Sequence, residues 1–191
     1  MSAFEIRTAS CHDAAALSGI YRHYVENTAV SYEYEAPDAA EFERRIRDTL
    51  KSYPYLAAVQ DGEVVGYAYA GVFNSRKAAD RTVEASIYVA ADKRRAGLGR
   101  ALYARLEELL RQQNVQVVTV KIACCDREDE YLSRDSVEFH LSCGYRICGV
   151  VENCGYKFGR WYSLMIMQKD LGSFPDQGCS FIPFPLLQNE L

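Results

Sequence analysis

The most constraining feature of this sequence is a short basic segment with two glycines, Arg94-Arg95-Ala96-Gly97-Leu98-Gly99-Arg100. Residues 85–90, just before it, are rich in β-branched and aromatic side chains, which favours a strand. After it, leucines recur at three- and four-residue spacing as far as Leu110, which favours an amphipathic helix. Glycines at such a junction let backbone N–H groups approach a ligand, and a helix start adds unpaired donors and partial positive charge. The segment is therefore predicted to bind an anion, and a pyrophosphate fits it best.

Two common phosphate-binding motifs do not fit this segment. A Walker A loop needs Lys followed by Ser or Thr, and no such pair follows Gly99. The dinucleotide fingerprint G-x-G-x-x-G needs a third glycine where Leu102 stands. The residues alone thus predict a site for an anion such as a pyrophosphate, and they do not identify the molecule that carries it.

The segment resembles the Gln/Arg-x-x-Gly-x-Gly/Ala loop with which GCN5-related N-acetyltransferases (GNAT) bind the pyrophosphate of acetyl-CoA. Other blocks, in the same order, resemble the phosphinothricin or amino-acid branch of that family. They are residues 82–89 (TVEASIYV), residues 136–140 (SVEFH), Gly144-Tyr145, and Gly155-Tyr156-Lys157 with Trp161. The resemblance covers residues 4 to 170 and implies the α/β GNAT fold, a mixed, mostly antiparallel sheet flanked by helices.

Composition excludes several other classes of protein. The chain has 191 residues, a length that suits one domain with a substantial core. A net charge of −4 argues against nucleic acid or an anionic membrane as the main partner, and no apolar run is long enough to span a membrane. Seven cysteines without C-x-x-C spacing suit free thiols in a reducing compartment, and three scattered histidines predict no metal site. We therefore expect a cytoplasmic protein.

Periodicity and turn residues predict alternating strands and helices. Strands are expected at residues 4–8, 55–60, 63–73, 82–90, 115–123, 146–153 and 160–169, with Asp61-Gly62 as a hairpin turn. Helices are expected at 13–27, from Pro37-Asp38 through Leu50, at 97–113 and at 135–143. Residues 1–171 are expected to form the domain. Residues 172–191, interrupted by prolines, are expected to be an extended arm packed on this domain or on a partner subunit.

The resemblance implies two catalytic residues. Glu84 matches the proposed base, which draws a proton from the acceptor ammonium directly or through water. Alternatively, Glu84 is an exposed carboxylate in an ion pair with Arg81 or Arg76. His140 stands where many members have Tyr and this branch has His, and an imidazole with a near-neutral pKa can protonate the CoA thiolate. Its alternative role is that of a half-buried structural histidine.

The resemblance also implies the residues that bind acetyl-CoA. The pantetheine arm is expected along Tyr88 and Val89, where a backbone N–H would polarise the thioester oxygen. Residues 94–100 would bind the pyrophosphate, and Ser136 is a further cofactor contact.

The acceptor side follows from the same resemblance. Tyr32 would cover an amino acid, Arg76 would pair with its α-carboxylate, and Tyr156 would line the pocket. Two residues depart from the herbicide-detoxifying enzymes: Asn74 stands where they have Lys, and Ala79 where they have Tyr. A sulfone or sulfoximine amino acid is therefore expected in preference to phosphinothricin.

The expected function is acetyl-CoA-dependent acetylation of the amine of a small amino-acid-like substrate. One alternative is a protein, peptide or polyamine acetyltransferase, which would need an open acceptor groove. Another is a non-catalytic acetyl-CoA sensor, which should lack Glu84 and His140. A homodimer is expected, because the branch usually pairs and the apolar residues 174–187 would gain from a partner surface.

Overall fold

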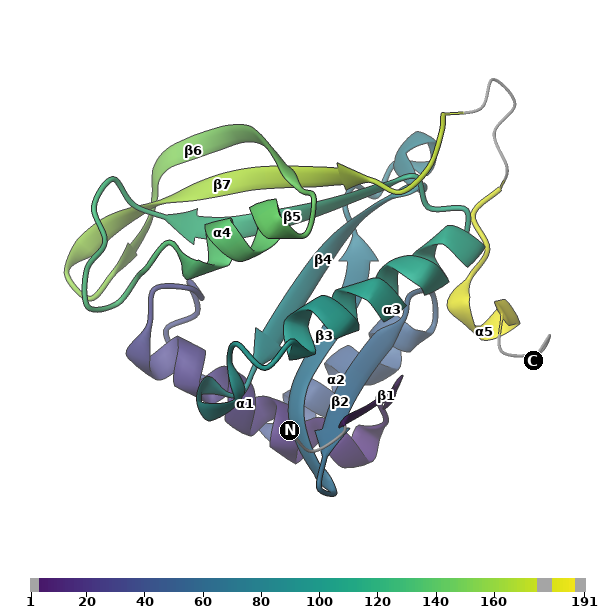
Figure 1. Ribbon diagram of the computed structural model, residues 1–191, viewed down its shortest axis with the longest axis horizontal. Helices are drawn as coiled ribbons and strands as arrows, with labels where there is room; N and C mark the ends of the chain where they lie inside the picture. Colours follow the sequence, from purple (N-terminus) through teal and green to yellow (C-terminus); the bar gives the residue numbers. More distant parts are fainter. Residues whose placement is uncertain (1–3, 175–179, 188–191) are drawn as a thin grey trace.

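The computed structural model describes residues 4–174 and 180–187, which form a seven-stranded sheet with helices on both faces (Figure 1). The strand order is β1-β2-β3-β4-β5-β7-β6. Every neighbouring pair is antiparallel except β4 with β5, so the expected mixed, mostly antiparallel sheet is confirmed. The strands are β1 (Phe4–Thr8), β2 (Tyr55–Gln60), β3 (Glu63–Val72), β4 (Thr82–Val89), β5 (Val117–Cys124), β6 (Arg146–Lys157) and β7 (Arg160–Asp170). The helices are α1 (Ala14–Asn27), α2 (Ala39–Leu50), α3 (Leu98–Gln112), α4 (Asp135–Ser142) and α5 (Phe184–Leu187).

Local sequence features explain where several elements begin and end. The side chain of Asp38 accepts the N–H of Glu41 at 2.8 Å and caps α2, the helix expected to begin at Pro37-Asp38. Asp61 and Gly62 both have positive φ, which a tight hairpin turn between β2 and β3 requires. The main difference is β6, which continues past its expected end at residue 153 to Lys157. The register of β6 against β7 shifts between residues 151 and 155, so the regular pattern stops there while the pairing resumes beyond it.

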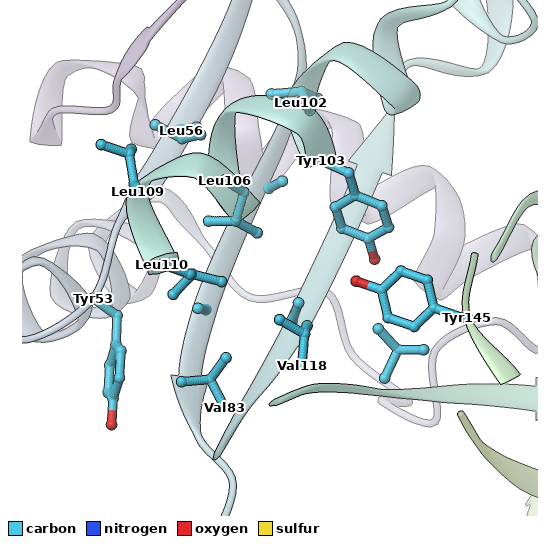
Figure 2. Close-up of a cluster of buried hydrophobic side chains, with 14 of the residues drawn as sticks. Tyr53, Leu56, Val83, Leu102, Tyr103, Leu106, Leu109, Leu110, Val118 and Tyr145 are labelled. Atoms are coloured by element: carbon cyan, nitrogen blue, oxygen red, sulfur yellow. The ribbon is translucent and has the colours of Figure 1, made fainter. Parts of the chain in front are cut away.

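The sheet separates two apolar clusters, and β4 contributes to both. Figure 2 shows the leucines of α3 packed over Val83 of β4 and Val118 of β5. Successive strand side chains point to opposite faces. Ile87 and Val89 therefore lie on the α3 face with Val83, and Tyr88 packs against the cluster under α1 and α2. Glu84, one residue after Val83, shares the α1–α2 face with Tyr88.

A split between β4 and β5 is the feature of the sheet that matters most for function. The two strands pair only where Thr82, Val83 and Glu84 meet residues 117–119, and beyond Glu84 they separate (Figure 1). Over the rest of their length β4 pairs with β3 and β5 pairs with β7. The facing edges of β4 and β5 thus carry backbone N–H and C=O groups that no ladder uses, and a bound ligand can use them.

The described part of the C-terminal arm packs on the same chain. The expected extended path is interrupted by α5, a single helical turn with Pro185 in its first turn, where proline needs no N–H partner. Phe184 is buried in the cluster under α3. The amide of Gln113 donates to the carbonyls of Ser52 and Ile182 at 2.7 and 2.8 Å. These bonds fix residues 180–187 to the end of α3.

Candidate active site

The predicted anion-binding segment forms a tight turn at the start of α3. Gly97 is the N-cap of the helix and has a φ of 83°, a left-handed conformation that favours glycine. Arg95 also has positive φ, so the chain reverses sharply between β4 and the helix. The first N–H groups of a helix lack intrahelical partners. The turn therefore presents backbone donors and basic side chains together, as an anion site requires.

A groove of about 680 Å³ runs between this turn, the end of β4 and α4. The predicted cofactor residues that line it are Val89, Arg94, Arg95, Gly97, Leu98, Gly99, Arg100 and Ser136. Tyr88 lines a deeper cavity instead, and Ala96 packs against the apolar cluster under α3. Tyr24 of α1 also lines the groove, and Arg94 lies over its ring at 5.2 Å. Arg100 donates to the Ser142 carbonyl at 3.3 Å, which ties the turn to α4.

Gly99, which lines the groove, also packs closely against α4. A Cβ at this position would lie 3.0 Å from the ring of Phe139, tighter than most Cβ contacts, so the ring would have to shift by a few tenths of an ångström. Gly99 thus allows the close packing of α4 on α3. At Gly97 a Cβ would meet no atom within 4 Å, so only its backbone conformation demands glycine.

The deeper cavity, of about 50 Å³, lies in the split between β4 and β5. Its walls are residues 85–88 of β4 and residues 120–123 of β5, closed by Val30, Tyr103, Ser136 and His140. Four residues, Val30, Ile87, Ser136 and His140, line both this cavity and the groove. The two spaces therefore share a wall, and the groove leads toward the split.

The backbone of Val89 borders this opening. The Tyr24 hydroxyl donates to the Val89 carbonyl at 2.6 Å. The next amide, that of Ala90, donates to the Val65 carbonyl of β3 at 2.9 Å. Because successive amides in a strand point to opposite edges, the Val89 N–H faces away from β3 and toward the split.

Glu84 lies at the apex of the split, as the last residue of β4 that pairs with β5. Its Oε2 is 2.7 Å from the Nζ of Lys121 on β5, and its side chain is 27% exposed. The alternative role considered for Glu84 was an ion pair with Arg81 or Arg76. In the structure its ion-pair partner is Lys121. Sequence periodicity does not reveal this pair, since it depends on the register of two strands that are far apart in the chain.

His140 is buried and both its ring nitrogens have partners. Nδ1 lies 2.6 Å from the Ser136 carbonyl, which only accepts, so Nδ1 carries the proton. Nε2 then accepts from the Tyr103 hydroxyl at 2.8 Å. Burial disfavours the charged ring and lowers the pKa of His140 to about 4, so the ring is neutral at pH 7. Sequence reasoning missed Tyr103, although a tyrosine on the apolar face of a helix usually needs a hydrogen-bond partner.

The predicted acceptor residues fall into two places. Tyr32 donates to the Ser163 carbonyl at 2.9 Å, and its ring occupies the space beside Gly155 where a side chain would clash. Tyr156 follows on the same strand, is half-exposed and packs against Trp161 at 5.1 Å. Arg76 is exposed and precedes the start of β4, and it lines neither the groove nor the deeper cavity. Successive strand side chains point to opposite faces, so Tyr156 lies on the exposed face with Trp161 and Tyr32 on the buried face beside Gly155. The structure thus does not bring Tyr32, Tyr156 and Arg76 together.

A split parallel strand pair, with a turn of free backbone donors and arginines on one side and a carboxylate at its apex, suits an acyl-CoA-dependent acyltransferase. Residues 6–166 match the family model described as the acetyltransferase (GNAT) domain. The chain belongs to the GNAT family and is an N-acetyltransferase, so the resemblance seen in the sequence is confirmed.

Relatives of known name extend the comparison. The chain is 35% identical over 167 residues to phosphinothricin N-acetyltransferase of Streptomyces viridochromogenes, covering 87% of each chain. It is 34% identical over 170 residues to the L-methionine sulfoximine/L-methionine sulfone acetyltransferase of Salmonella typhimurium, covering 87% of this chain and 94% of the other. Among solved structures, the phosphinothricin acetyltransferase of Sinorhizobium meliloti in complex with AcCoA superposes with a TM-score of 0.80 at 31% identity, over 90% of each chain.

Two further observations concern residues 4–174 and 180–187 only. Within them, no group of three or more His, Cys, Asp or Glu side chains is arranged as a metal site. None of the helices in these ranges is both long and apolar enough to cross a membrane.

Proposed function

We propose that this enzyme transfers the acetyl group of acetyl-CoA to the amine of a free amino acid with a polar or oxidised γ-substituent, such as a methionine sulfone or sulfoximine. The observation that carries the proposal is the shared wall between the cofactor groove and the split, with Glu84 at the apex. The names of the relatives, which act on phosphinothricin, methionine sulfoximine and methionine sulfone, support the substrate class.

Acetyl-CoA fits the groove by its charge and shape. The N–H groups at the start of α3, with Arg94, Arg95 and Arg100, would bind the pyrophosphate. The pantetheine arm would then follow Val89 toward the split. The Val89 N–H is the donor that would polarise the thioester oxygen.

Glu84 is the base in this proposal. Lys121 binds Oε2, and Oε1 of the same carboxylate would take a proton from the acceptor ammonium, directly or through one water. The neutral amine then attacks the thioester carbon, and the C–S bond breaks. The ion pair keeps the carboxylate in one orientation beside the apex.

His140 and Tyr103 would together return a proton to the departing CoA thiolate. Both side chains line the cavity in the split. The Nδ1 proton of His140 is donated to the Ser136 carbonyl and the hydroxyl proton of Tyr103 to Nε2 of His140, so the proton that reaches the thiolate has to leave one of these partners.

The acceptor site is proposed to use Tyr32 as part of its wall and Arg76 as the partner of the α-carboxylate. The amide of Arg76 donates to Asn74 Oδ1 at 2.9 Å, which orders the backbone at the base of this guanidinium. Asn74 and Ala79 lack the charge and the phenol that would bind a second acidic group. An uncharged sulfone or sulfoximine is therefore preferred over phosphinothricin.

A homodimer in the cytoplasm completes the proposal. Edge strand β6 exposes Ile147, Val150 and Val151, each nearly half-accessible, which is an apolar edge that pairing would cover. The six cysteines in the described residues are free thiols, as a reducing compartment requires. Sedimentation at micromolar concentration tests pairing: a dimer is expected, and a 21.6 kDa species alone would reject it.

The substrate class is tested by measuring CoA thiol release with a panel of acceptors. The panel contains methionine sulfone, methionine sulfoximine, phosphinothricin, ordinary amino acids, polyamines and a lysine-containing peptide. The sulfone and sulfoximine are expected to give the highest kcat/KM. Faster turnover of polyamines or the peptide than of every free amino acid would overturn the proposal, and no release with any amine would favour an acetyl-CoA sensor.

A further inference from the structure

Lys157, near the end of β6, is a buried lysine that binds backbone carbonyls. Its side chain is almost fully buried, and Nζ donates to the carbonyls of Val25, Thr28 and Ser31 at 2.7, 3.0 and 2.7 Å. Burial lowers the pKa of Lys157, so the three acceptors offset a real desolvation cost. An ammonium has three donors, and all three are used. We call this arrangement the Lys157 clamp.

The clamp holds the segment that follows α1. Val25 lies in the last turn of the helix, where carbonyls lack intrahelical partners and favour a cation. Thr28 and Ser31 stand on either side of residues 29–30. Residues 28–31 are therefore fixed at both ends by one side chain, which comes from a strand more than a hundred residues further along the chain.

The held segment includes a residue of the transfer site. Val30 lines both the cofactor groove and the cavity in the split. The same end of α1 carries Tyr24, whose hydroxyl binds the Val89 carbonyl at 2.6 Å. A shift of residues 28–31 would therefore move a wall that both substrates share.

We infer that Lys157 is a positioning residue for acetyl transfer, which acts by holding the carbonyls on either side of Val30. This inference rests on the proposed function, since it concerns the same site. A merely structural lysine would support the fold without setting the geometry of the reacting groups. Misplacement by about 1 Å can cost about a hundredfold in rate, so a loosened wall should be visible in kinetics.

The test compares Lys157→Met with Arg7→Met. Arg7 forms an ion pair with the buried Asp13 at 2.7 Å, at the opposite end of α1, so its loss costs stability without touching residues 28–31. Kinetics are measured below the unfolding transition of both variants, with hydrogen exchange of the amides of residues 28–31 in parallel. Lys157→Met is expected to lower kcat/KM for the amino acid by about ten- to a hundredfold and to speed exchange, whereas Arg7→Met leaves both unchanged.

Wild-type kcat/KM and exchange in Lys157→Met, or an equal kinetic loss in Arg7→Met, would overturn the inference. If Lys157→Met does not fold, Lys157→Gln is judged by the same criteria, because it keeps two donors but loses the charge. If the wild-type enzyme acetylates no amino acid, the proposed function fails. The exchange measurement still decides on the clamp in that case.

Discussion

The carboxylate of Glu84 and the ammonium of Lys121 lie 2.7 Å apart, beside the point where β4 and β5 separate. Lys121 is two residues beyond Thr119, the partner of Glu84 in the parallel ladder. Both side chains are partly exposed, so the pair contributes at most about 1 kcal/mol to the free energy of unfolding. In the proposed mechanism the pair orients the carboxylate of Glu84.

Glu84→Gln is expected to lower kcat by about two to four orders of magnitude, the usual cost of losing a general base, with unchanged affinity for acetyl-CoA. Lys121→Met is the matched control, because it breaks the same ion pair and keeps the carboxylate. It should lose much less activity. Equal losses in the two variants, measured by steady-state kinetics with calorimetric titration of acetyl-CoA, would make Glu84 a structural partner of Lys121.

Gly99→Val is expected to weaken acetyl-CoA binding more than Arg94→Ala. The added side chain would collide with Phe139 and displace α4, which forms one wall of the groove. Arg94→Ala removes one of several cations around the turn and leaves the backbone donors in place. Isothermal titration distinguishes the two, and wild-type affinity in Gly99→Val would show that acetyl-CoA binding does not depend on the close packing at Gly99.

Because the ring of His140 is buried and neutral, the free energy of unfolding is expected to fall in acid. The pKa of His140 is lowered to about 4 in the folded protein, against an ordinary value of 6.5, so between these values the unfolded state binds more protons. The contribution of the neutral His140 ring to the free energy of unfolding is fully present above pH 6.5. It falls by about 3 kcal/mol as the pH drops to 4. The free energy of unfolding in urea, followed against pH, should therefore decline more steeply in the wild type than in His140→Gln. Parallel curves would show that the ring is not buried as described.

Arg76→Ala is expected to raise the KM for free amino acids and to leave unchanged the KM for amines without a carboxylate. The reason is that a guanidinium forms a bidentate pair with a carboxylate and has no comparable interaction with a plain amine. Each amino acid is compared with its decarboxylated amine as the matched acceptor. A KM that rises equally for both would show that Arg76 acts without contact to the carboxylate.

Local sequence patterns were sufficient for most elements of the fold and for the glycine turn before α3. The leucine spacing after residue 97, the Asp38 cap and the Asp61-Gly62 turn act over a few residues, so their consequences can be read in order along the chain. The glycine at the N-cap of α3 likewise indicates, at its own position, that the backbone there is left-handed. For these features the physical cause and its effect lie within one turn or one hairpin.

Contacts between distant strands and helices were decided only by the tertiary structure. The Glu84 pair with Lys121 depends on the register of β4 and β5, and the pairing of His140 with Tyr103 depends on how α4 crosses α3. The same holds for the close approach of Gly99 to the ring of Phe139 on α4.

The sequence by itself thus determined most of the elements, the position of the turn before α3 and the family, because these follow from short-range periodicity and motif. Only the tertiary structure decided which side chains meet in the split between β4 and β5, and which proton His140 holds. The burial of a titratable group and the identity of its hydrogen-bond partners depend on segments that are far apart in the chain. No single segment encodes them.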